Sequence, residues 1–77
     1  MASDYIKIKR KVKDIPDLYS FNSLLEASTL SDLDKEIMRM HYLQEKDFAY
    51  IADSLGYSEI AIKARHKKAI IKISKLI

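Results

Sequence analysis

The sequence predicts an all-α domain, a small bundle of four helices with a helix-turn-helix, to which a short N-terminal helix can be added as a fifth. One glycine and one proline in 77 residues favour helices over strands and turns. Along most of the chain, apolar residues recur at the three- and four-residue spacing of one helical face. At 77 residues, the chain has room for one domain with a modest core.

Residues 1–15 are interpreted as a basic N-terminal segment, and residues 16–77 as the helix-turn-helix domain. The alternation of Ile6 to Lys9 is typical of a strand, whereas a 3-4-3 spacing of apolar residues is typical of a helix. The residues with that spacing are Tyr5, Ile8, Val12 and Ile15. We favour an amphipathic helix from about Asp4 to Lys13. A basic arm that orders only on a phosphate backbone is the alternative. Pro16 either separates this helix from the next one or is the first residue of the next helix.

Two further helices are expected before the helix-turn-helix. From about Asp17 to Ala27, the apolar residues at helical spacing are Leu18, Phe21, Leu24 and Leu25. From about Asp32 to Leu43, the inner stripe is Leu33, Ile37 and Met40, with Leu43 at its end. Ser31 and Asp34 resemble the two ends of a capping box, with aspartate in place of the usual glutamate.

The helix-turn-helix itself is predicted around residues 51–65. Asp47 should cap a short helix, Phe48 to Leu55. Gly56, the only glycine, suits the left-handed backbone that ends a helix, and Ser58 should cap the helix that follows. An ordinary αα-hairpin is the alternative interpretation.

The last helix is expected to run from Glu59 to near the C-terminus. Ala52 is small where this helix must cross the short one closely, and Ile62 should turn inward against Ile51 and Leu55. On a helical wheel, its inward face is Ile62, Ala69, Ile73 and Leu76, with His66 and Ile70 at the edge. The opposite face holds Ile60, Ala64, Lys67, Lys68 and Ile71, flanked by Lys63, Arg65 and Lys72.

Charge is segregated along the chain, although the net charge is only +3. Residues 1–17 have a net charge of +2, residues 18–57 of −4, and residues 58–77 of +5. The positive charge therefore lies on the helix that a helix-turn-helix would place in a DNA groove. A solvated lysine-rich face would not account for the acidic stretch before it, so the pattern favours nucleic-acid binding.

No catalytic, metal or cofactor site is predicted. The chain has no cysteine, which excludes disulfides and thiolate metal ligands, and its two histidines have no clustered carboxylate nearby. His66 is expected to be a packed residue and not a ligand. We find no glycine-rich loop or nucleophilic serine context, so an enzyme is not expected. Neither a membrane span nor a signal-peptide core is present in the sequence, and we expect a cytoplasmic protein.

Residues 30–77 resemble region four of bacterial sigma factors of the sigma-70 type, their C-terminal DNA-binding domain. The resemblance is carried by Leu30, Glu36 to Leu43, Ile51, Ala52, Leu55, Gly56, Ser58, Ile62, Lys63, Arg65, Ala69 and Ile73. The LuxR-type response-regulator domain fits less well, because Tyr42-Leu43 and the spacing of Arg65 and Ala69 are sigma-like. The resemblance implies a last helix that docks in the major groove of a promoter, and an earlier face that holds RNA polymerase.

Carried over by position, the resemblance implies ten DNA-contacting residues. The base-proximal ones are Ser58, Glu59, Ile60, Lys63 and Ala64. Arg65, Lys67 and Lys68 would lie along phosphates, with His41 at a backbone-contacting position and Tyr50 at the entrance of the first motif helix. Because Ile60, Ala61 and Ala64 stand where the family often has charged or amide residues, we expect weak sequence specificity.

The sequence therefore indicates a domain that binds double-stranded DNA and regulates transcription. The alternative is a protein-interaction module that binds RNA polymerase or competes with a sigma factor, with little DNA affinity. The separate domain with which sigma factors melt DNA is not found, so a complete sigma factor is not expected. Stand-alone domains that resemble this one are associated with phages and mobile elements.

Two apolar sets have no assigned partner: the N-terminal stripe, and the pair Ile71 and Ile77. They either meet within one chain, with the N-terminal helix on the C-terminal half of the last helix, or meet between chains. The second arrangement would give a homodimer that binds two half-sites.

Overall fold

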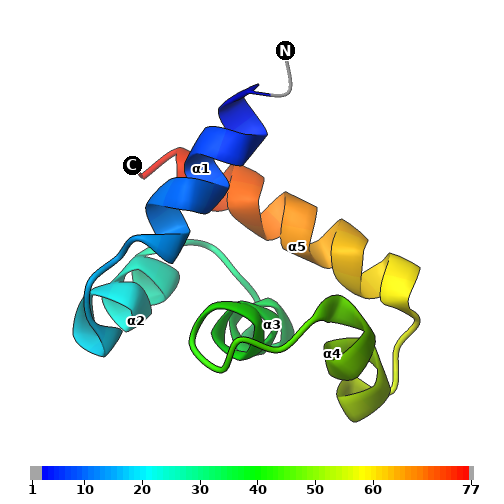
Figure 1. Ribbon diagram of the computed structural model, residues 1–77. Coiled ribbons are helices and arrows are strands. Elements are labelled where there is room, and N and C mark those ends of the chain that lie inside the picture. The colour runs from blue at the N-terminus through cyan, green and yellow to red at the C-terminus, as the bar shows by residue number, and fades with distance from the viewer. Residues whose placement is uncertain (1–2, 77) are drawn as a thin grey trace.

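The computed structural model describes residues 3–76 and contains five helices in that range. They are α1 (Ser3–Lys13), α2 (Leu18–Ala27), α3 (Asp32–Tyr42), α4 (Phe48–Leu55) and α5 (Glu59–Ser74). The all-α prediction is confirmed, including the N-terminal helix. In Figure 1, α1 and α5 lie at the top, where α1 crosses the C-terminal half of α5, and α2, α3 and α4 lie below them. Among the described residues, no helix combines the length and the apolar character needed to cross a bilayer.

The helices begin where short polar side chains can accept hydrogen bonds from their first free N–H groups. The oxygens of Asp17, Ser31, Asp47 and Ser58 accept from the backbone N–H three residues on, at 2.7 to 3.2 Å. These caps set the starts of α2 to α5, and the caps predicted at Ser31, Asp47 and Ser58 are confirmed. Pro16 lies outside both flanking helices and acts as a break.

The core is divided into two clusters that share α3 and α5. One joins α1, α2, α3 and the C-terminal half of α5, through Val12, Phe21, Leu25, Leu30, Met38, Ala69, Ile70 and Ile73. The other joins α3, α4 and the first turns of α5, through Ile37, Met40, Ile51, Ala52 and Ile62. Ile62 packs with Ile51 and partly buried Leu55, as predicted. The second cluster packs α4 against the first turns of α5 and so fixes the position of one motif helix relative to the other.

Several predicted positions are corrected by this packing. Met38, which lay outside the expected stripe of α3, is fully buried because α3 is covered on two sides. Leu18 is 60% exposed, Leu43 38% and Leu76 47%. Leu43 caps the end of α3, and Leu76 lies beyond Lys75, which caps the end of α5, so neither continues an inward helical face.

The N-terminal stripe finds its partner within the same chain. Val12 is 1% exposed and packs in the cluster that contains Ala69 and Ile70, with Tyr5, Ile8 and Ile15 partly buried around it. His66 and Ile70, expected at the edge of the inward face, are therefore fully buried. Ile71 remains exposed, and Ile77 lies outside the described residues. A homodimer is thus not needed to cover the stripe, and it stays a prediction.

The turn at Gly56 gives a first test. Gly56 has φ +78° and caps α4 through its N–H and the carbonyl of Ala52, while a Cβ added there would meet nothing within 4 Å. Gly56→Val should therefore destabilise the domain by backbone strain alone, about 1–2 kcal/mol, or roughly 4–16 °C in Tm. Thermal unfolding measures this cost. Gly56→Asn is the control, because asparagine tolerates the left-handed region, and equal Tm values for both variants would contradict the strain.

Candidate nucleic-acid interface

The exposed face of α5 follows from how its other face is buried. Residues at helical spacing fix the buried side: Ile62, His66, Ala69, Ile70 and Ile73. The opposite side therefore faces solvent, and Ile60 is 81% exposed there. Seven of the ten predicted contact residues are exposed on or next to α5: Ser58, Glu59, Ile60, Lys63, Ala64, Lys67 and Lys68.

The two polar candidates for reading bases bind each other in the free protein. Nζ of Lys63 lies 2.9 Å from Oε2 of Glu59, one helical turn apart, with both side chains about half exposed. Such exposed pairs contribute at most about 1 kcal/mol, so DNA can separate them. The rest of this face is apolar or small at Ile60 and Ala64, and can offer bases little beyond contact with a thymine methyl.

Arg65 lies at the edge of this face in an ion pair with α3. Its Nη1 is 3.1 Å from Oδ1 of Asp34, whose side chain is only 12% exposed, and its guanidinium lies 5.7 Å from the centre of the Tyr57 ring. Asp34 was expected to complete a capping box, but its carboxylate binds this arginine. Arg65 thus fixes α5 to α3 and the turn, and a phosphate would have to compete with Asp34.

His41 and Tyr50 lie outside α5, near the start of α4. The ring centre of His41 nevertheless lies 5.3 Å from that of His66, on the buried side of α5. His41 is partly buried, with Nδ1 2.9 Å from the carbonyl oxygen of Lys46 and its ring stacked on Phe48 at 4.3 Å. Tyr50 is 50% exposed, and the ammonium of Lys46 lies 4.8 Å from its ring centre. These contacts hold both side chains at one rim of the α3–α4 connection, residues 43–47.

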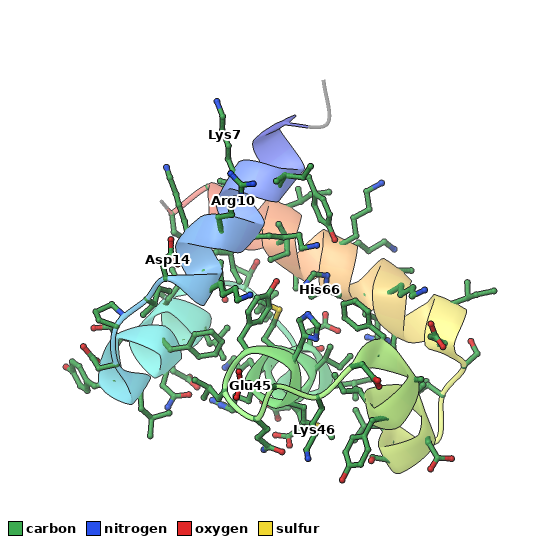
Figure 2. All side chains as sticks on the ribbon, viewed as in Figure 1. Lys7, Arg10, Asp14, Glu45, Lys46 and His66 are labelled. Carbon is green, nitrogen blue, oxygen red and sulfur yellow. The ribbon has the colours of Figure 1, made fainter. Side chains whose placement is uncertain are left out.

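Behind α5, His66 is the only buried charged or polar residue among the described ones, at 1% exposed. Tyr5 Oη lies 3.2 Å from its Nδ1, and Tyr42 Oη lies 2.7 Å from its Nε2. Figure 2 shows the imidazole pointing from α5 into the interior. Burial, with the nearby charges of His41 and Lys9, lowers the pKa of His66 to about 4. Burial also raises the pKa of Tyr5 and of Tyr42.

The neutral histidine therefore links three helices. One ring nitrogen donates and the other accepts, so one tyrosine hydroxyl accepts and the other donates. The packed-residue prediction for His66 is in line with this environment, since both nitrogens have tyrosine partners from α1 and α3. No group of three or more histidine, aspartate or glutamate side chains within residues 3–76 is arranged to hold a metal ion.

The fold turns the segregation of charge along the sequence into two layers. The basic segments 1–17 and 58–77 contain α1 and α5, at the top of Figure 1, and the acidic segment 18–57 contains the three helices below. The acidic layer holds its own basic residues in contacts: Lys35 and Arg39 both pair with Glu26. A polyanion is therefore attracted to the α1–α5 layer and repelled by the other.

The molecule has an open groove that was not predicted from the sequence. The groove has a volume of about 630 Å³ and lies between α1 and the α3–α4 connection. Its lining includes Lys9, Arg10 and Lys13 from α1, and His41 and Lys46 from the other side. The basic N-terminal segment was a signal for it, but only the docking of α1 places these residues opposite His41.

The family model described as sigma-70, region 4, matches residues 28–75, which include α3, α4, α5 and the turns between them. That family comprises DNA-binding helix-turn-helix domains and is not a family of enzymes. No curated protein and no solved structure matches the chain significantly. Helices α1 and α2 lie before the matched residues.

Proposed function

This chain belongs to the sigma-70 region 4 family, and from that premise we propose that it regulates transcription by binding double-stranded DNA through α5. The observation that carries the proposal is the exposed face of α5, on which Lys63, Lys67 and Lys68 surround a small apolar strip. The major groove admits an α-helix, and the lysines of this face suit the phosphates that border the groove.

Binding is proposed to depend mostly on phosphates and only weakly on sequence. The base-proximal residues offer one lysine and one glutamate, paired with each other, beside Ile60 and Ala64. Cationic side chains position a protein on the duplex without reading it, whereas specificity needs matched donors and acceptors. We also propose that the protein acts in the cytoplasm, where it would meet such DNA.

The test is the dependence of affinity on salt. Replacing Lys67 and Lys68 with alanine should weaken binding to every duplex alike and make the slope of log affinity against log salt shallower, by about 0.9 for each phosphate that is no longer neutralised. Titration of a random-sequence duplex over a series of salt concentrations measures the slope. An unchanged slope would remove both lysines from the interface.

Lys35→Ala is the control, because Lys35 lies in the acidic layer and pairs with Glu26. It removes one positive charge away from α5 and should leave the slope at its wild-type value. RNA polymerase core, offered in a pull-down, distinguishes the alternative function: capture of polymerase by a protein that binds no duplex would favour the interaction module.

A further inference from the structure

The groove between α1 and the α3–α4 connection has the charge and the position to hold a stretch of DNA backbone beside the recognition helix. We propose that it is a second phosphate-binding site, in which Arg10 and Lys13 contact the duplex that flanks the one bound by α5. This proposal rests on the proposed function, because the flanking duplex reaches the groove only when α5 is docked.

The wall formed by α1 supplies the cations. Lys9, Arg10 and Lys13 all line the groove, and Arg10 and Lys13 are exposed. None of the described ion pairs involves a residue of α1. The charges of this wall are thus not neutralised by a described carboxylate, unlike those of Lys63 and Arg65. Figure 2 shows Arg10 on α1, above the connection that carries Glu45 and Lys46.

The opposite wall connects the groove to the candidate interface. It includes His41, and Lys46, whose ammonium lies over the ring of Tyr50. His41 and Tyr50 are the two predicted backbone contacts outside α5, so the groove continues the rim on which phosphates are expected. Asp47 also lines this wall and keeps its negative charge, although one of its oxygens accepts the N–H of Tyr50.

Glu45 is the other acidic residue that lines the groove, and unlike Asp47 it does not cap a helix. It is exposed and has a left-handed backbone, with φ +57°, a conformation uncommon for a residue with a side chain. A phosphate in the groove would be repelled by its carboxylate. The proposal therefore predicts effects of opposite sign: loss of affinity when the α1 cations are removed, and a gain when Glu45 is neutralised.

Position can be separated from overall charge, because α1 offers a matched pair. Lys7 and Lys11 are exposed on the same helix but do not line the groove. Two double variants, Arg10→Gln with Lys13→Gln and Lys7→Gln with Lys11→Gln, each remove two positive charges from α1. Thermal melting of both variants checks that α1 stays docked before duplex binding is measured.

For the Arg10 and Lys13 variant, we expect the salt slope to fall by about 1.8 and the affinity at low salt to fall on the order of tenfold. The Lys7 and Lys11 variant should keep a slope near wild type, and Glu45→Gln should bind a few-fold more tightly. If the two double variants lost affinity and salt slope equally, the effect would come from the overall charge of α1, and the proposed phosphate site would be wrong.

Failure of this proposal differs from failure of the proposed function. If the Lys67 and Lys68 variant loses slope while the Arg10 and Lys13 variant does not, DNA binding by α5 stands and the groove is not part of it. If the Arg10 and Lys13 variant instead loses capture of polymerase core with unchanged DNA affinity, the groove binds protein and the proposal is wrong. If no variant alters the slope, the proposed function itself fails.

Discussion

Val12→Asp should destabilise the domain by about 3 kcal/mol or more, the largest effect we expect from any single substitution in α1. Val12 is 1% exposed and packs among residues of α2, α3 and α5. A carboxylate there must either stay charged without a partner, become protonated, or force α1 away from α5. Each route carries a cost, and the smallest of these costs sets the observed loss.

Thermal unfolding measures this loss as a fall in Tm of more than about 10 °C for a domain of this size. Hydrogen exchange of α1 amides separates local from global loss, because undocking of α1 would expose Ser3–Lys13 while leaving α4 and α5 protected. In that case Tyr5 also leaves His66, and the imidazole resonances of His66 should shift.

Ile6→Asp is the matched control, since Ile6 lies on the same helix and is 45% exposed. It introduces the same charge and should change the free energy of unfolding by no more than about 0.5 kcal/mol. If both aspartate variants melted alike, Val12 would not be in a buried seam, and a homodimer that covers the N-terminal stripe would again need testing by sedimentation.

Features of the fold that depend on neighbours in sequence could be predicted. The caps at Ser31, Asp47 and Ser58 act on an N–H three residues away, and Gly56 ends α4 through its own backbone. The periodicity of α5 likewise predicted most of its buried and exposed faces, because helical geometry alone relates them.

What could not be predicted depends on contacts between distant residues. The assignment of Arg65 to phosphate stays a prediction, but its ion pair with Asp34, 31 positions earlier, could not be predicted from the sequence. His66 is buried because Tyr5, 61 positions earlier, approaches it from α1. A helical wheel places both residues on flanks of α5 and carries no information about which helix covers each flank. The groove has the same origin, since its two walls meet only in the folded chain.

Acid should begin to destabilise the domain near pH 6.5, above the range in which carboxylates titrate, and His66 should be the cause. Its pKa falls from 6.5 in the unfolded chain to about 4 in the fold. Between these values, the unfolded chain binds a proton that the folded chain does not. The contribution of His66 to stability is therefore full above about pH 6.5 and is lost as the pH falls toward 4, amounting to about 3 kcal/mol in total.

The physical reason lies in the two tyrosines and the nearby charges. Protonated His66 donates from both nitrogens, so the hydroxyls of Tyr5 and Tyr42 must both accept, and one existing hydrogen bond has to reverse. The new charge would also be buried near Lys9 and His41, both of which oppose it. Thermal melting at pH 7.5 and pH 5.0 should show a fall in stability of about 2 kcal/mol, or on the order of 10 °C.

His66→Gln tests the assignment, because an amide can still donate to one tyrosine and accept from the other but does not titrate in this range. The variant should be less stable at neutral pH, yet its stability should change little between pH 7.5 and 5.0. His41→Gln should keep most of the wild-type loss. A loss of equal size in wild type and His66→Gln would assign the acid sensitivity to another group. The coupling of α1, α3 and α5 through His66 would then be structural and independent of its protonation.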